Sequence, residues 1–268
     1  MEATGVALNK LAELEEELEV VDKDVELFKL KKVQPIFKRR DKLLEDVPEF
    51  WKVVLSQHGD FGNYVRAGDL KYIDAIRKID LVPLCLDDSS CDPRDFRITF
   101  YFDGIDGDFE GQEVSKVFKV CYDKSKVKFS REEDEDDYDE DLGFLTSEAV
   151  NIKWPKSYDW INPLKIEDKS SSEGKRNYRI GMKSFFAWFK WTGLKPRKEF
   201  PDGGGLASLL SEDIYPHCIK YYAEAQRDLV DETGDDEEVS DGPLQLDDVL
   251  LESMSDSENQ HVIKKARK

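Results

Sequence analysis

Apolar residues recur every seven positions along the first 45 residues. The two core positions of this heptad are filled by Leu11, Leu18 and Val25, and by Ala7, Leu14, Val21 and Phe28. Charged residues occupy the positions between them, which excludes a membrane span. A helix over residues 4–45 would be about 60 Å long, more than a compact domain of this size can cover. We therefore predict that it pairs with a second copy through Leu11, Leu14, Leu18, Val21, Val25 and Phe28.

The heptad fails at one place. Lys32 falls on a core position and Pro35 follows it, and a proline inside a helix removes a hydrogen-bond donor and favours a kink. We expect the tightest self-pairing between Ala7 and Phe28. From Pro35 onward the chain should turn and dock on the next domain, and Pro48 should open a second helix.

After about residue 80 the spacing of apolar residues changes from the helical three to four to the alternation typical of strands, and it becomes helical again near Ile180. Strands are expected over residues 81–86, 97–102, 114–122, 127–130 and 151–155, joined as an antiparallel meander. Residues 163–177 are polar and predict a loop or a lid, whereas helical spacing returns at Ile180, and the seven residues from Phe185 to Trp191 include five aromatic ones. Gly203, Gly204 and Gly205 predict a flexible loop. The fold class is therefore α+β, a long dimerisation helix followed by an antiparallel sheet with helices.

Charge is concentrated in two short segments. Nine of the ten residues 132–141 are acidic, and residues 231–268 hold twelve acidic against four basic residues. Because these segments carry −9 and −8 of the net charge of −19, the rest of the chain carries only −2. Such segments are too polar to pack. We divide the chain into a helix (1–46, kinked near Pro35), an α+β domain (47–230, with an acidic loop at 132–141) and a disordered acidic tail (231–268).

Compartment signals are few. The four cysteines, Cys85, Cys91, Cys121 and Cys218, are scattered, and neither a signal-peptide pattern nor an apolar run of 18 residues is present. The chain is therefore expected to be intracellular and reduced. The terminal basic cluster Lys264, Lys265, Arg267 and Lys268 predicts nuclear import.

Candidate chemistry is sparse. The three histidines, His58, His217 and His261, lie far apart and match no metal-ligand spacing, so no metal site is predicted. The residues from Asp106 to Gly111 copy half of a calcium loop, but Val117 stands where a bidentate glutamate is needed, so a turn is the better interpretation. We predict no cofactor and no enzymatic activity. Acidic arms would attract strongly basic proteins, or would serve only to keep the chain soluble.

Several motifs together resemble the nucleosome assembly protein family, in its SET-like branch. The first is Gln34-Pro35-Ile36-Phe37 with Arg39-Arg40, continuing to Val47-Pro48 and Phe50-Trp51. The others follow in the family's order: Ile98-Thr99-Phe100-Tyr101-Phe102, Ile152-Lys153-Trp154, Ser184-Phe185-Phe186-Ala187-Trp188-Phe189, and Asp213-Ile214-Tyr215-Pro216 with Lys220-Tyr221-Tyr222. Further segments, such as Trp191-Thr192-Gly193-Leu194-Lys195-Pro196, are similar to a fungal member. The resemblance covers most of residues 6–230.

The resemblance implies a headphone-shaped homodimer, in which paired long helices join two α+β domains whose concave underside receives histones. It also implies a non-catalytic nuclear histone chaperone that binds H3-H4, alone or with the other core histone pair, shields them from DNA and presents H3 to a fungal histone H3 lysine acetyltransferase. The alternative is a regulatory subunit that mainly stabilises and stimulates that acetyltransferase. No membrane contact and no sequence-specific nucleic-acid binding are expected.

The resemblance also directs the choice of contact residues. The candidates for histone binding are Glu212, Asp213, Glu224, Asp228, Asp231 and Glu232. The candidates for acetyltransferase binding are Lys175, Arg176 and Arg179, because a basic patch would not select histones.

Overall fold

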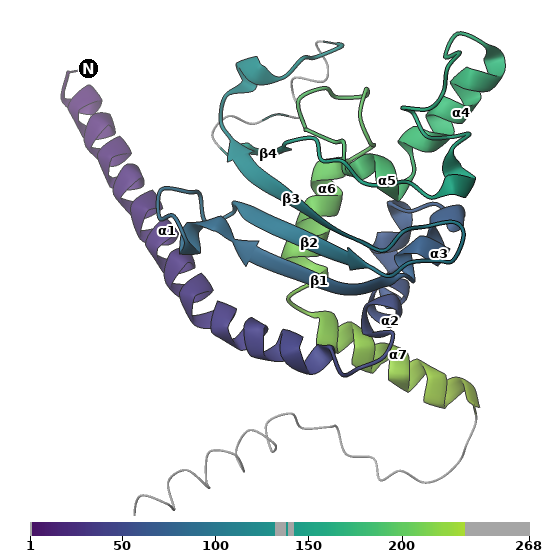
Figure 1. The fold of residues 1–268 in the computed structure, drawn as a ribbon. Helices are drawn as coiled ribbons and strands as arrows, with labels where there is room; N and C mark the ends of the chain where they lie inside the picture. Colours follow the sequence, from purple (N-terminus) through teal and green to yellow (C-terminus); the bar gives the residue numbers. More distant parts are fainter. Residues whose placement is uncertain (1, 132–137, 139–141, 234–268) are drawn as a thin grey trace, which may run out of the picture. The chain divides into compact units, whose positions relative to one another are not determined.

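A single long helix opens the fold in the computed structural model. The structure describes residues 2–131, 138 and 142–233, with side chains for 7–131, 138 and 142–229. Helix α1 runs from Glu2 to Leu44 and contains Pro35. Figure 1 shows α1 curving along its length, so that its end lies beneath strand β1. The compact unit that contains α1 and the α+β domain extends to Arg227, and Asp228 begins a second unit.

Four strands form one antiparallel meander in the order β1 (Ile76–Pro83), β2 (Phe96–Phe102), β3 (Gln112–Cys121) and β4 (Phe144–Ser147). Strands β2 and β3 match two of the predicted strands. The first strand begins earlier than predicted and stops at Pro83, and Leu84–Leu86 form a 3-10 turn. The α+β class is confirmed.

Two predicted strands are wrong, because side chains or distant loops satisfy their backbone groups. In the segment 127–130, the amide of Lys128 donates to the carbonyl of Leu194 at 2.8 Å. In the segment 151–155, the side chain of Gln112 bonds both the amide and the carbonyl of Lys153, each at 2.9 Å. Strand β4, which the sequence pattern did not predict, pairs with β3 instead.

The core lies against one face of this sheet. Helix α5 (Phe185–Trp188) supplies aromatic rings that meet Phe100 edge-on, with centroids 5.8 Å from Phe185 and 5.9 Å from Trp188. The domain also contains helices α2 (Phe50–Gln57), α3 (Leu70–Ile73), α6 (Gly203–Ser208) and α7 (Cys218–Thr233), and α6 lies behind the sheet in Figure 1. The predicted dense aromatic element is thus fully buried.

The predicted lid and the predicted glycine loop are both partly helical. Helix α4 runs from Ser172 to Met182, and the Ser171 hydroxyl caps it by accepting from the amide of Gly174 at 3.0 Å. Residues Gly203 to Gly205 begin α6, with Asp202 as its cap. A side chain at Gly203 would meet the Trp191 ring at 2.5 Å, so the glycine permits close packing rather than flexibility.

Buried polar contacts attach α1 to the α+β domain. The Gln34 amide donates to the carbonyl of Leu81 at 3.2 Å. The Arg40 guanidinium donates to Asp41 at 2.8 Å and to the carbonyl of Tyr215 at 2.7 Å, and the Tyr215 hydroxyl donates to Asp41 at 2.6 Å. We call Arg40, Asp41 and Tyr215 the anchor. These three residues are at least nine-tenths buried. The hydrogen bonds therefore replace the water that would otherwise solvate the Arg40 and Asp41 charges.

The anchor should be sensitive to loss of one hydroxyl. Tyr215→Phe removes a donor from the buried Asp41 carboxylate, and we expect the free energy of unfolding to fall by about 1–3 kcal/mol in urea denaturation. Tyr222→Phe is the matched control, because the Tyr222 ring stacks on Phe50 and its change should stay within about 0.5 kcal/mol. Equal effects of the two substitutions would show that the anchor is not specific.

Candidate functional site

Acidic side chains from two distant parts of the sequence line one shallow pocket. Asp60 comes from the 3-10 turn Gly59–Asn63, and Glu212 and Asp213 come from the π-helix Leu209–Ile214 that follows α6. The pocket has a volume of about 380 Å³, and Asn63, Tyr64 and Ser208 add polar groups to it. π-Helical turns are rare and frequently mark functional sites. We call this the acidic pocket.

Asp213 is held by three neighbours. Its carboxylate accepts from the Tyr221 hydroxyl at 2.7 Å and lies 3.2 Å from ring nitrogens of both His58 and His217. Burial opposes ionisation, but hydrogen bonds from Tyr221, His58 and His217 outweigh it and hold the pKa of Asp213 below its usual range. Asp213 therefore stays ionised and mainly joins the π-helix to α7 and His58.

Burial and the negative charge of the pocket raise the pKa of two tyrosines, Tyr64 in its lining and Tyr221 next to Asp213. Burial, reinforced by the Asp213 hydrogen bond and by the charges of Asp213, Glu224 and Asp60, raises the pKa of Tyr221 to about 12. Burial together with Asp202 and Asp60 likewise raises the pKa of Tyr64. Asp60 and Glu212 are exposed, and neither forms an ion pair with another residue of the described part of the chain. A Lys or Arg side chain that enters the pocket would therefore meet carboxylates that can pair with it.

The remaining predicted histone contacts are placed only in part. Glu224 is half-buried on α7, with its carboxylate 3.9 Å from the ammonium of Lys220. Asp228 begins the second compact unit, and the side chains of Asp231 and Glu232 lie outside the described residues. Asp60 was not predicted from the sequence, because no local motif distinguishes it from other aspartates. Folding places it in the same pocket as Glu212, which is about 150 residues away in the sequence.

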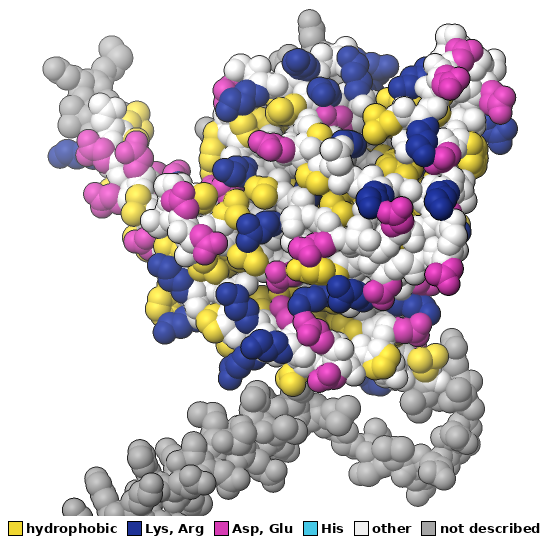
Figure 2. Space-filling model, in the orientation of Figure 1, with side chains coloured by type: hydrophobic (Ala, Val, Ile, Leu, Met, Phe, Trp, Pro, Cys, Tyr) yellow, Lys and Arg dark blue, Asp and Glu magenta, His cyan; other side chains and the backbone are white. Residues whose placement is uncertain are grey.

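The predicted basic strip lies on α4. Lys175, Arg176 and Arg179 are all exposed, and spacings of three and four residues place Arg179 beside the other two on one helix face. Figure 2 shows Lys and Arg side chains interspersed with Asp and Glu over α4. This surface is electrostatically opposite to the acidic pocket.

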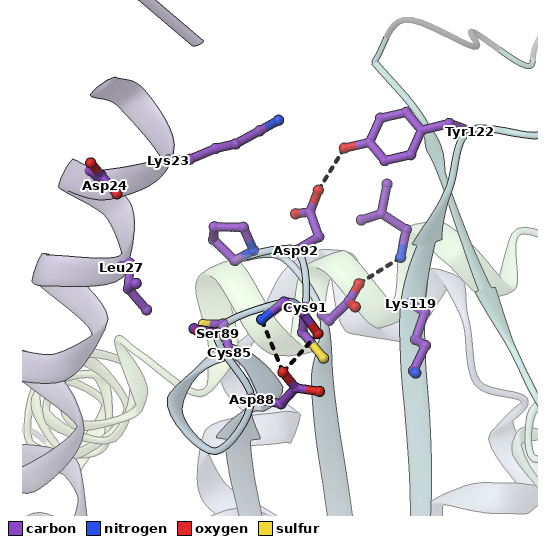
Figure 3. A pocket seen from close by; sticks show the side chains of 14 residues that line it. Lys23, Asp24, Leu27, Cys85, Asp88, Ser89, Cys91, Asp92, Lys119 and Tyr122 are labelled. Atoms are coloured by element: carbon purple, nitrogen blue, oxygen red, sulfur yellow. Dashed lines mark hydrogen bonds between the residues drawn. The ribbon is translucent and has the colours of Figure 1, made fainter. Parts of the chain in front are cut away.

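The predicted dimerisation residues are exposed apolar side chains in the single chain. Leu11, Leu14, Leu18, Val21, Val25 and Phe28 expose between 53% and 63% of their surface. The face of α1 that looks toward the sheet carries other residues: Lys23, Asp24 and Leu27 line a cavity of about 590 Å³ with the β1–β2 loop (Figure 3). The heptad face is thus exposed in the single chain.

Neither a metal-binding cluster nor a helix suited to a membrane is found among the described residues. Across 2–131, 138 and 142–233, no group of three or more His, Cys, Asp or Glu side chains is arranged to hold a metal ion. Asp108, in the suspected calcium loop, instead binds Lys71, Tyr72 and Ser157. No described helix is both long and apolar enough to cross a membrane. The import cluster Lys264, Lys265, Arg267 and Lys268 and the acidic loop, apart from Tyr138, lie outside the described residues.

Comparison with known proteins gives a consistent result, although no protein-family model matches the chain. The chain is 53% identical over 241 residues to vacuolar protein sorting-associated protein 75 of Saccharomyces cerevisiae, covering 90% of this chain and 86% of the relative. It is 26% identical over 239 residues to NAP1-related protein 1 of Oryza sativa subsp. indica, covering 84% and 79%.

Solved structures agree. The crystal structure of the Vps75 histone chaperone is similar at a TM-score of 0.73 and 52% identity, covering 82% of this chain and 98% of that chain. The crystal structure of Ccp1 shares the fold at 23% identity, with a TM-score of 0.58, and covers 83% of this chain and 97% of that chain. With its long helix, its four-stranded meander and a relative more than half identical, the chain belongs to the nucleosome assembly protein (NAP) family of histone chaperones.

Proposed function

We propose that this chain is a nuclear, non-catalytic histone chaperone that binds H3-H4 and presents H3 to a fungal histone acetyltransferase. The observation that carries the histone part is the acidic pocket, where Asp60 and Glu212 are exposed beside the ionised Asp213. Histones are strongly basic, so such a pocket suits their Lys and Arg side chains. Binding of the other core histone pair is compatible with the same surface.

In the proposed mechanism, the chaperone competes with DNA for the basic side chains of histones. DNA phosphates bind histones non-specifically and strongly, and a chaperone that covers histone cations makes that contact less favourable until correct deposition occurs. The acidic segments 132–141 and 231–268 would add long-range attraction. The pocket would add a defined docking position.

Dimerisation through α1 is the second part of the proposal. Six apolar side chains at heptad positions are exposed, and removing each from water would contribute about 25 cal/mol per Å² of apolar surface buried. An antiparallel partner helix of the same sequence would cover this face and join two α+β domains.

Charges placed in the heptad should separate the protomers. We expect Leu18→Asp with Val25→Asp to give monomers by light scattering after gel filtration, because two buried carboxylates per helix would oppose pairing. Glu15→Ala with Asp22→Ala, at outward positions of the same helix, should leave dimers. A persistent dimer in the first variant would place the dimer interface elsewhere.

Charge reversal should separate the carboxylates that contact histones from those that build the pocket. Asp60→Lys with Glu212→Lys should weaken H3-H4 binding by about tenfold at moderate salt, because both side chains are exposed at the pocket. The control, Asp87→Lys with Glu113→Lys, makes the same charge change at exposed sites away from the pocket. Equal weakening by both pairs would mean that only net charge matters.

Binding of the acetyltransferase through Lys175, Arg176 and Arg179 is supported by their shared exposed face on α4. These cations would pair with an acidic surface of the enzyme. If the chain were mainly a regulatory subunit, it would stimulate the acetyltransferase on histone peptides too short to need a chaperone.

A single substitution tests this contact. Arg179→Glu should reduce co-purification of the acetyltransferase several-fold while H3-H4 binding stays unchanged, because the site lies on α4 and not at the acidic pocket. Lys119→Glu, at an exposed basic residue on β3 and not on α4, is the control. Parallel loss of both activities would indicate misfolding and would contradict a separate contact.

A further inference from the structure

A third cavity, of about 320 Å³, lies beside α4. Tyr178 and Met182 face it from α4, and Ala187 of α5 and Phe200 also line it. The basic residues Lys175, Arg176 and Arg179 do not line this cavity, so it is distinct from the acetyltransferase contact proposed above.

Four lysines surround the cavity: Lys169, Lys190, Lys195 and Lys198. Among the described residues its acidic lining residue is Glu199, whose carboxylate accepts from the amide of Thr192 at 2.8 Å and from the amide of Gly193 at 2.9 Å. Glu199 is therefore held within its own loop, while Lys195 and Lys198 are exposed. The positive character extends beyond the cavity, because residues 163–200 carry ten Lys or Arg and only four Asp or Glu.

The cavity wall is apolar as well as basic. Leu164 lines it with 73% of its surface exposed, which makes it the most exposed large apolar side chain of the described residues. Trp154, Met182 and Phe200 continue the apolar surface inward. Covering these apolar side chains with a ligand would remove them from water, which is favourable. The cavity therefore offers a hydrophobic contact next to four lysines.

We propose that this lysine-rimmed cavity is a docking site for a short acidic segment of a partner protein, in which carboxylates flank one large apolar side chain. The apolar side chain would cover Leu164, Met182 and Phe200, and the flanking carboxylates would reach the lysines. A nucleic acid would use the cations and stack its bases on aromatic faces, whereas Leu164, the most exposed apolar side chain of the wall, offers no aromatic face. A histone, being basic, would be repelled here and would keep to the acidic pocket.

Peptide binding to the full chain tests the proposal by fluorescence polarisation. The probe is a labelled ten-residue peptide of Asp and Glu with one central Phe, compared with the same peptide carrying Ala in place of Phe. We expect the Phe peptide to bind about tenfold more tightly. Lys195→Glu with Lys198→Glu should weaken its binding about tenfold, and Leu164→Ala should weaken it several-fold without changing the salt dependence.

The matched control is Lys126→Glu with Lys128→Glu, an equal charge change at exposed lysines outside the cavity, which should leave binding unchanged. Equal affinity for the Phe and Ala peptides would overturn the proposal, because only charge would then be recognised. So would a single-stranded oligonucleotide of matched charge that binds as tightly and responds equally to Lys195→Glu with Lys198→Glu.

Discussion

The buried contact among Arg40, Asp41 and Tyr215 joins the two structural parts of this protein. Arg40 and Asp41 belong to the last turns of α1, and Tyr215 directly follows the π-helix that carries Glu212 and Asp213. The Arg40 guanidinium also lies 4.4 Å from the ring centroids of both Phe37 and Tyr215. The anchor thus joins α1 and the element that carries the acidic pocket at the same point of the fold.

Opposite charges are kept on separate surfaces of the α+β domain. The acidic pocket lies between the Gly59–Asn63 turn and the π-helix, whereas the cations of α4 and the lysine-rimmed cavity lie on the segment 163–200. The net charge of −19 hides this separation, because two short segments supply nearly all of it. A chaperone with such a surface can hold a basic cargo and an acidic partner without the two competing.

Within the acidic pocket, carboxylates differ in what they do. Asp213 accepts the Tyr221 hydroxyl and contacts two histidines, so it positions the π-helix. Asp60 and Glu212 are exposed and available to a ligand. Substituting Asp213 would change the stability of the fold as well as ligand binding. The charge reversal is therefore confined to Asp60 and Glu212.

Periodicity predicted the elements whose environment is local to the sequence. The heptad in α1 and the alternation in β2 and β3 are each contained in one segment, so pattern alone was sufficient. Strand β4 was missed because its four residues are all half-buried and show no alternation. The false strand at 151–155 has strand-like residues, but the Gln112 side chain takes the place of a neighbouring strand.

Long-range contacts account for what could not be predicted at the site. Asp60 and Glu212 line one pocket only after folding. Lys116 lies in a strand and is fully buried, and its side-chain nitrogen donates to the carbonyls of Glu148, Phe189 and Trp191. No spacing in the sequence encodes either contact. The family resemblance directed attention to Glu212 and Asp213, but it could not show that Asp213 is engaged by its neighbours.

The central claim is that a symmetric dimer built on α1 carries H3-H4 on its α+β domains. Sedimentation velocity of the chain alone, and of the chain mixed with H3-H4, tests both halves at once. We predict a dimer for the chain alone and a single heavier species containing both proteins in the mixture. A monomer that sediments unchanged in the presence of H3-H4 would contradict the account.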